Sequence, residues 1–374
     1  DGHGTHVASI IGANRNAFGM RGVAYDASLY DYRVGPNNSE GYFPGLASDR
    51  QVATVFRQAI TDNIDIINNS WGSETSVTSL TANQVNLYYK NSIAAAKEAQ
   101  KNGTLFVFAA GNERRDQVDI WGGLPYHASE LAGSWLTVVA INDTNTEAYY
   151  TNRCGVAQAF CVTAPGSSVK AAMANTSNRH ITYSGTSMAA PHVSGIAAVL
   201  MQKFPSLSAS AITARIKRTA SVASLKGKNG ETVETHGMQV MRAIFGHGLI
   251  NQTKASAQIG TLTLATGQNF FDEGSGIDIT QQRLRLPLGL PSAVTRQILT
   301  DSFIAFDRFD GANFEGLGDE IGGRVAVEGR EAGRPAVGGL EGPDERLVGG
   351  GLRMIPEVVD RPEHAFRRRG AERP

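Results

Sequence analysis

Two uninterrupted apolar runs, Thr104 to Ala109 (TLFVFA) and Leu136 to Ile141 (LTVVAI), constrain the fold of this chain more than any other feature. A strand that is apolar on both faces must be covered on both sides, as in a parallel sheet between two layers of helices. Helical spacing over Gln51 to Thr61 precedes a strand-like segment, Ile64 to Asn69, and a second helical pattern, Val85 to Lys101, precedes TLFVFA. This alternation predicts an α/β fold with a mostly parallel sheet flanked by helices.

Further strands are predicted outside this core. Ser28 to Val34 (SLYDYRV) is strand-like, and three later segments alternate like β-strands: Thr261 to Ala265, Leu284 to Leu288 and Ser302 to Phe309. In a parallel sheet the functional groups collect at the carboxyl ends of the strands. The residues that follow each core strand, and those at the helix starts, are therefore the candidate site residues.

The charge balance argues against two classes of protein. The 35 Lys and Arg residues are matched by 35 Asp and Glu residues. A nucleic-acid-binding protein or a polybasic membrane-surface protein needs a surplus of positive charge. The sequence contains no run of about 18 apolar residues, so no transmembrane helix is predicted.

Ser187 is the leading candidate for a reactive group. It follows Gly185 and Thr186 and precedes an apolar run rich in small residues, which is typical of a buried helix. Pro191 fits an early turn of that helix, where a missing N–H has no cost. At a helix N-terminus the free N–H groups and the helix dipole favour a developing negative charge. A serine hydroxyl becomes an effective nucleophile only when a base takes its proton.

Two other short strings supply candidate partners. His3 lies between glycines in DGHGTHVAS and is the candidate base, whereas Asn112 follows a buried strand in FAAGNE. The Asn112 amide can donate, together with the Ser187 backbone N–H, to the oxyanion of a tetrahedral intermediate. Taken singly, the serine reads as a helix cap, the histidine as a structural residue and the asparagine as a turn residue. Their conjunction in three specific strings favours catalysis.

DGHGTHVAS and YSGTSMAAPHVSG together resemble the signature segments of the subtilisin-like serine proteases (subtilases, peptidase family S8). The resemblance covers roughly residues 1–257. It implies a three-layer α/β fold, incomplete at the N-terminus, and a serine endopeptidase that acts on polypeptide substrates and not on nucleic acid. His3 falls on the family's general base, Ser187 on its nucleophile and Asn112 on its oxyanion donor, while His6 falls on a structural position.

The same resemblance implies a substrate-binding site with one extended edge, a facing wall and a floor. The edge consists of Ser70, Trp71 and Gly72. Ala110 and Gly111 form the facing wall, and Gly123 forms the floor. Glycine walls without a buried carboxylate admit a large apolar side chain, so an apolar substrate residue is expected there. The residues suggest no cofactor and no metal site, and they do not indicate whether calcium is bound.

The family's third catalytic residue, an aspartate on a strand well before the histidine, has no counterpart in this sequence. The chain begins two residues before His3, and Asp1 is too close to stand for that aspartate. The expectation is an N-terminally truncated fragment that is inactive as a protease, with the aspartate and the first elements of the sheet upstream.

Cys154 and Cys161 are the two cysteines of the chain. From the residues alone, two free buried thiols and a small surface disulfide are both open. The strings NRCG…FC…APG, NNSWG and GHGLIN look like the protease passengers of bacterial autotransporters. That resemblance implies a disulfide, an oxidising compartment, a secreted or cell-surface location in a bacterium, and a parent tethered to an outer-membrane β-barrel.

Three parts are expected along the chain. Residues 1–257 are the catalytic domain without its N-terminal part, and residues 258–310 are a β-rich linker toward an absent barrel. Residues 311–374 are a tail rich in Gly and Arg, without lysine and with few aromatic residues. Such a composition predicts either disorder or a sequence read out of frame.

Two alternative functions remain for comparison. An α/β-hydrolase esterase is disfavoured because the serine string is Gly-x-Ser-x-Ala and because the histidine precedes the serine. A non-catalytic secreted passenger with a protease fold is disfavoured by the intact His3, Asn112 and Ser187. For the full-length parent these residues argue against it, whereas for a fragment that lacks the aspartate the non-catalytic interpretation is favoured.

Overall fold

The computed structural model describes residues 2–16, 19–32, 34, 48–176 and 178–259, and five short segments: 262–265, 276–278, 305–307, 309–310 and 312–314. The chain divides into two units, 1–328 and 329–374, and every described residue belongs to the first. Among the helices of these residues, none combines the length and apolar character needed to cross a lipid bilayer.

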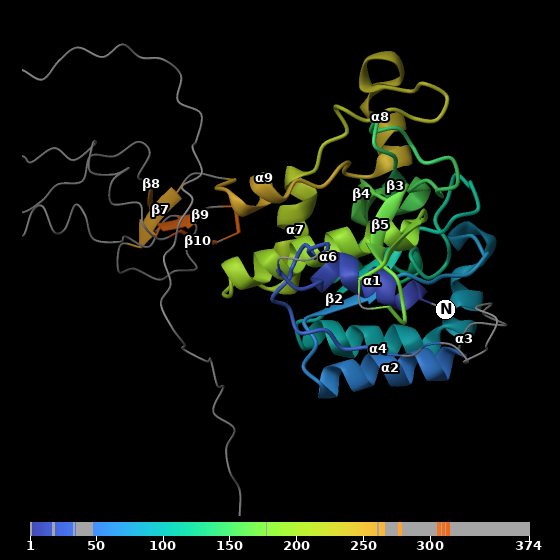
Figure 1. Cartoon of the computed structure of the whole chain (residues 1–374), viewed down its shortest axis with the longest axis horizontal. Coiled ribbons are helices and arrows are strands. Elements are labelled where there is room, and N and C mark those ends of the chain that lie inside the picture. The colour runs from blue at the N-terminus through green and yellow to red at the C-terminus, as the bar shows by residue number, and fades with distance from the viewer. Residues whose placement is uncertain are drawn as a thin grey trace, which may run out of the picture. The chain divides into compact units, whose positions relative to one another are not determined.

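A parallel sheet of four strands lies at the centre of the first unit (Figure 1). Its strands follow one another in chain order: β1 (Ile66–Asn69), β2 (Leu105–Ala109), β3 (Trp135–Ile141) and β4 (Cys161–Pro165). Each strand pairs in parallel with the next. The three predicted core strands are thereby confirmed to within two residues at their ends, and so is the α/β class.

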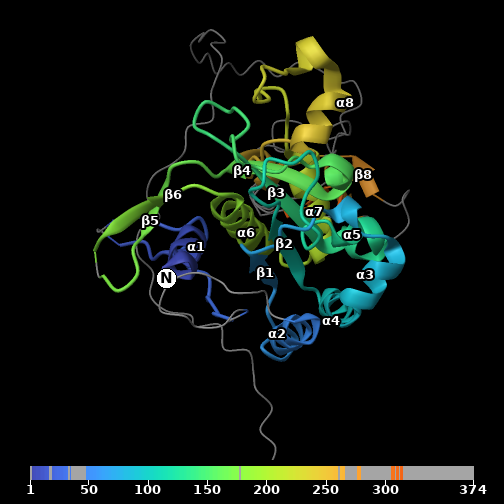
Figure 2. The same cartoon turned by 90° about the vertical axis from the view of Figure 1, so that its right-hand side faces the viewer.

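Helices cover both faces of this sheet (Figure 2). On one face, Phe106 and Phe108 of β2 join the apolar residues of α2 (Asp49–Thr61) and α4 (Lys90–Lys101). On the other face, the alternate residues of β2 pack against α6 (Thr186–Lys203). The alternation of side chains along a strand therefore divides the core into two clusters, as the continuous apolar runs predict.

The remaining elements surround this core. The helices are α1 (His3–Gly12), α3 (Ala82–Tyr88), α5 (Leu124–His127), α7 (Ala209–Thr219), α8 (Val233–Phe245) and α9 (Gln252–Ser256). The short 3₁₀ helices are Val77–Ser79, Ser129–Ser134 and Gly155–Phe160. The other strands are β5 (Val169–Ala172), β6 (His180–Tyr183), β7 (Leu262–Ala265), β8 (Gly276–Asp278), β9 (Ala305–Asp307) and β10 (Asn313–Phe314).

Two predicted elements are wrong. The helix expected over residues 85–101 is two helices, α3 and α4, which meet at Tyr89 with φ −122°. The Tyr89 ring packs edge-on against Trp121 with 4.9 Å between ring centroids, a tertiary contact that local spacing does not reveal. The strand expected over residues 28–34 is absent from its described part, residues 28–32 and 34. A strand needs a hydrogen-bonded neighbour, and no described strand pairs with it.

Strands β5 and β6 form an antiparallel pair, and beyond α9 the described segments form a separate antiparallel sheet in the order β10-β9-β7-β8. Strand β7 confirms the prediction over residues 261–265, and β9 lies within the predicted segment 302–309. The predicted strand 284–288 lies outside the described residues, as does the tail after residue 314. Strand β10 follows the composition change at Gly311 and still pairs with β9, so the β-structure crosses that boundary.

A buried ion pair holds this later segment against helix α7. The Arg215 guanidinium of α7 is fully buried and bonds both carboxyl oxygens of Asp310, at 2.7 and 3.2 Å. Arg215 also donates to the carbonyls of Ala255 and Ala257 and lies over the ring of Phe204. A charge buried this deeply needs its partner, because the unpaired charge has lost its hydration.

Asp310→Ala should therefore lower the free energy of unfolding by about 3–5 kcal/mol. The matched control is Glu98→Ala, which breaks the Arg57–Glu98 pair at 2.8 Å, whose side chains are 47% and 49% exposed. A pair that remains hydrated contributes about 1 kcal/mol or less. Urea denaturation of both variants measures the difference. Equal losses would show that Asp310 does not compensate a buried charge.

Candidate active site

Ser187 is the second residue of α6, which begins at Thr186 after Gly185. The next three residues of this helix are buried, as predicted for a serine at the start of a core helix. The Ser187 hydroxyl donates to the carbonyl of Ser70 at 3.2 Å. Ser70 follows the last residue of β1, so the start of α6 meets the carboxyl end of a core strand.

The interpretation of Pro191 needs correction. Pro191 is the sixth residue of α6 and lies beyond the first turn. An N–H at this position would donate to the carbonyl of Ser187, four residues earlier, and proline has none. That carbonyl instead accepts a hydrogen bond from the Ser70 hydroxyl at 2.8 Å. The Ser70 hydroxyl, directly after β1, therefore takes the place of the missing N–H.

Asn112 lies beside the start of α6. Its Oδ1 accepts two hydrogen bonds from Thr186, from the backbone N–H at 2.9 Å and from the hydroxyl at 3.0 Å. With Oδ1 held in this way, Nδ2 lies 3.7 Å from the point that a Cβ at Gly185 would occupy. The amide donors therefore face the residues that lead into Ser187. The sequence reasoning missed Thr186 as the anchor, although it stands directly before the candidate nucleophile.

The loop that carries Asn112 is held by a second asparagine, Asn152. Its buried side chain donates to the Ala110 carbonyl at 3.0 Å and accepts from the Glu113 N–H at 3.1 Å. Gly111 has φ +99°, and a Cβ there would come within 2.3 Å of Asn152 Nδ2. Ala110 is fully buried. No signal in the sequence pointed to Asn152, because it lies 40 residues after Asn112.

His3 is the first residue of α1, which packs against α6. Gly2, before it, adopts φ +83°, and a Cβ there would lie 3.9 Å from the Tyr183 hydroxyl. Tyr183 ends β6, shortly before α6 begins. Burial, and secondarily the charge of His6, lower the pKa of His3 below its usual value. A neutral imidazole at neutral pH is the form that can accept a proton.

His6 fastens α1 to the hairpin of β5 and β6. The ring is fully buried, and its Nε2 lies 3.1 Å from the Val169 carbonyl and 3.2 Å from the Ile181 carbonyl. It also packs on the Tyr183 ring, with 4.6 Å between centroids. Two carbonyl acceptors place the ring proton on Nε2. The structural role that the resemblance gave His6 agrees with these contacts.

Acid should destabilise the protein through His6. Burial lowers the pKa of His6 in the folded state, whereas the unfolded state keeps a value of about 6.5. As the pH falls below that value the unfolded chain takes up the proton first, so stability is lost. We expect His6→Gln to reduce the loss in unfolding free energy between pH 8 and pH 5.5, measured by urea denaturation at both pH values. The same loss in both proteins would contradict this role.

A buried carboxylate, that of Asp119, lies next to the residues expected to form the substrate edge. The sequence analysis had assumed that no buried carboxylate is present there. Asp119 is fully buried; one carboxyl oxygen accepts from the Ser73 N–H at 3.0 Å and the other from the Gly122 N–H at 2.7 Å. It thereby joins the residues next to Gly72 to those next to Gly123. Burial raises the pKa of Asp119 to about 8. The premise that no buried carboxylate adjoins these glycines is wrong.

Two of the edge residues, Trp71 and Gly72, and the floor residue Gly123 differ in what they contact. The Trp71 ring turns into the core and packs edge-on against Phe108 and Trp121, at 5.6 and 5.0 Å between centroids. A Cβ at Gly72 would lie 1.8 Å from an Asp119 carboxyl oxygen, and one at Gly123 would lie 2.5 Å from a Val77 methyl group. Both glycines are required by close packing behind them.

Gly72→Ala should lower the free energy of unfolding by about 1–3 kcal/mol, because the added methyl group overpacks a fully buried contact. Gly133→Ala is the matched control, since a Cβ there meets its nearest atom only at 3.8 Å, from Ser210. The control should change stability by about 0.5 kcal/mol or less. Thermal or urea unfolding measures both. A Gly72→Ala protein as stable as the control would mean that Asp119 moves aside easily.

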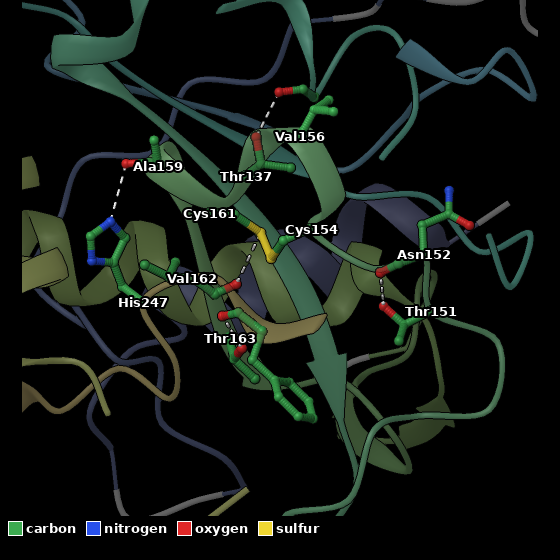
Figure 3. Close-up of a disulfide and its surroundings, with 12 residues drawn as sticks. Thr137, Thr151, Asn152, Cys154, Val156, Ala159, Cys161, Val162, Thr163 and His247 are labelled. Carbon is green, nitrogen blue, oxygen red and sulfur yellow. Dashed lines mark hydrogen bonds between the residues drawn. A yellow bond between two sulfur atoms is a disulfide. The ribbon is translucent and has the colours of Figure 1, made fainter. Parts of the chain in front are cut away.

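Cys154 and Cys161 form a disulfide, with 5.9 Å between their Cα atoms (Figure 3). The pairing implied by the resemblance is confirmed, but the expected surface position is wrong, because both residues are fully buried. The end of α8 covers them: the Cys154 N–H donates to the Ile244 carbonyl at 3.1 Å, and the His247 N–H donates to the Cys161 carbonyl at 2.9 Å.

Comparison with known proteins places this constellation in a family. The model of the subtilase family, peptidase S8, matches residues 1–248. An extracellular serine protease of Serratia marcescens is 32% identical over 278 residues, which covers 60% of this chain and 26% of that protein. A thermostable alkaline protease of Halalkalibacterium halodurans is 34% identical over 220 residues, covering 59% of this chain and 52% of that protein. The chain thus spans a quarter to a half of these relatives.

Solved structures agree on the fold. The PatG macrocyclase in complex with peptide superposes with a TM-score of 0.53 at 23% identity, covering 68% of this chain and 67% of that one. The self-cleaved protease domain of PatA gives a TM-score of 0.51 at 22% identity, with 68% and 82% covered. The family model covers well over half of the sequence, and the fold agrees with it: this chain belongs to the subtilase family of peptidases.

Proposed function

We propose that this chain carries the catalytic machinery of a secreted serine endopeptidase. The observation that carries the proposal is the anchoring of Asn112: its Oδ1 is held by Thr186, the residue directly before Ser187, at 2.9 and 3.0 Å. The amide donors are thereby fixed next to the start of a buried helix. An amide preorganised in this way, beside a serine, suits an oxyanion better than it suits a turn.

The reaction runs through an acyl-enzyme. Ser187 Oγ attacks the carbonyl carbon of the substrate while His3 takes the hydroxyl proton. The negative oxygen that forms accepts hydrogen bonds from the Asn112 amide and the Ser187 backbone N–H. The intermediate collapses, His3 gives the proton to the leaving amine, and the C–N bond breaks. Water then repeats the sequence on the ester and releases the acid. We assign the orienting carboxylate of a triad to no residue of the described chain.

Ser70, Trp71 and Gly72 form the proposed edge for the substrate backbone, with Ala110, Gly111 and Gly123 around the side chain that precedes the scissile bond. Asp119 leaves the expected apolar preference in place, because the side chain is buried and both carboxyl oxygens are bound to backbone N–H groups. Secretion from a bacterium, as an autotransporter passenger, is part of the proposal. The buried disulfide and the extracellular relative support an oxidising compartment.

The test is hydrolysis of peptide anilides by the native protein at its full natural length, with Phe or Arg before the anilide and Ser187→Ala as the blank. The inactivity expected above concerns residues 1–374 assayed alone. We expect turnover of the Phe substrate to exceed that of the Arg substrate. Turnover of neither would refute the proposed activity. A preference for Arg would retain the activity and overturn the apolar pocket.

A further inference from the structure

The carbonyl of Ser187 lies in the first turn of α6. It lacks the usual helical hydrogen bond, because the residue four positions later is Pro191, which has no N–H. The Ser70 hydroxyl takes this place at 2.8 Å, and the Ser187 hydroxyl donates back to the Ser70 carbonyl at 3.2 Å. Ser70 is 8% exposed, so water has little access to replace it. Each of the two serines thus donates its hydroxyl proton to the backbone carbonyl of the other.

The direction of the Ser70 hydroxyl depends on Asn68. A hydroxyl has a single proton, and Ser70 can donate it to Ser187 only if its other neighbour donates to it. Asn68 Nδ2 does so at 2.9 Å. Asn68 lies on β1, on the same face as Ile66, which packs with the α6 side of the core.

The orientation of the Asn68 amide is set in turn by α6. Asn68 Oδ1 accepts a hydrogen bond at 2.8 Å from the hydroxyl of Ser194, which is buried in the third turn of the helix. The other acceptor near this hydroxyl, the Ala190 carbonyl, is farther away at 3.3 Å, so the shorter bond to Asn68 is the stronger one. With its oxygen bound to Ser194, the amide presents its nitrogen to Ser70. The chain of bonds leaves α6 at Ser194, passes through β1 and returns to α6 at Ser187.

We propose that Ser194, Asn68 and Ser70 are positioning residues for the nucleophile. They supply the donor that Pro191 withholds, and so fix the first turn of α6, on which both the Ser187 hydroxyl and its backbone N–H depend. The catalytic part of this proposal rests on the proposed function. The bonding chain itself does not, because it is a property of the fold.

Asn68→Asp keeps the shape of the side chain and replaces the amide donor by a charged carboxylate oxygen, so it is paired with Ser70→Ala, which removes the donor to Ser187 without adding charge. Two carboxylate oxygens accept from both serine hydroxyls, so the Ser70 proton turns away from the Ser187 carbonyl. We expect kcat on the Phe anilide to fall about tenfold, the effect of one lost hydrogen bond, with KM within about twofold. Ser70→Ala should do the same by removing the donor outright.

Pro191→Ala supplies the control, because it restores an N–H four residues after Ser187. In the Asn68→Asp and Ser70→Ala backgrounds it should return kcat to within about twofold of the value for Pro191→Ala alone. Urea denaturation is measured on four proteins: the native protein, Ser70→Ala, Pro191→Ala and the double variant. Ser70→Ala should raise the unfolding equilibrium constant about tenfold in the native background, and far less in the Pro191→Ala background. If a single variant folds poorly, the double variant should recover it.

Three results would overturn the proposal: an unchanged kcat in both single variants, an effect confined to KM, or equal effects of Ser70→Ala with and without Pro191→Ala. An effect on KM alone would assign Ser70 to substrate binding. If the native protein hydrolyses no peptide, the proposed function fails, and the unfolding cycle still decides the bonding chain. If it hydrolyses peptide and both single variants have the native kcat, the function stands and the positioning chain is wrong.

Discussion

Ser187→Ala is expected to abolish peptide hydrolysis by the native protein while leaving its fold in place. The hydroxyl is the attacking group, and no neighbouring side chain in the described part of the site takes over that role. The expected loss in kcat is on the order of 10⁶, a magnitude measured in a subtilisin and therefore taken from the family rather than from this structure. Anilide hydrolysis and far-UV circular dichroism measure activity and fold.

The structural cost of this substitution should be small. The Ser187 hydroxyl donates one hydrogen bond, at 3.2 Å to the Ser70 carbonyl, and the residue is only partly buried. Loss of one such bond changes the free energy of unfolding by about 1 kcal/mol. A variant that retained more than a few per cent of the activity would exclude Ser187 as the nucleophile.

Asn112→Ala should lower kcat by about 10² to 10³ and leave KM nearly unchanged, because the amide binds the oxyanion more strongly than the ground-state carbonyl. This range also comes from a subtilisin and is inherited from the family. Steady-state kinetics on the Phe anilide separate the two constants. A change confined to KM would mean that Asn112 binds the substrate in its ground state.

Thr186→Val tests the anchoring of the same amide. It removes the hydroxyl that donates to Asn112 Oδ1 at 3.0 Å and keeps the backbone N–H that donates at 2.9 Å. The expected loss in kcat is smaller than that of Asn112→Ala. Thr186→Ser, which keeps the hydroxyl, should restore most of it. An equal loss in the Val and Ser variants would indicate that the packing of the whole Thr186 side chain, rather than its hydroxyl, determines kcat.

The core of the fold could be predicted because its signals are local. The apolar runs of β2 and β3 report burial on both faces, and the two clusters that divide β2 follow from strand alternation. The break at Tyr89 could not be predicted from local spacing; at this position the ring packs against Trp121, 32 residues later. The strand expected over residues 28–34 failed for a similar reason, because pairing requires a partner that no local pattern specifies.

At the site, residue types in short strings identified Ser187, His3 and Asn112 as candidates. How these residues are held could not be read in the same way. The Ser70 hydroxyl that compensates Pro191 lies 117 residues before Ser187, and Asp119 is a single acidic residue in an apolar segment, without a motif. The Ser70 contact arises only when the end of β1 meets the start of α6, and the Asp119 contacts arise only when its carboxylate lies between Ser73 and Gly122.

The central claim is that Ser187 is the activated serine of this chain. The most direct measurement is treatment of the native protein with a fluorophosphonate probe, followed by mass spectrometry of the peptide that spans Tyr183 to Gly195. We predict one adduct, on Ser187, formed much more slowly in Asn112→Ala and absent from Ser187→Ala. An adduct on another serine, or no adduct on a folded native protein that hydrolyses peptides, would contradict the account.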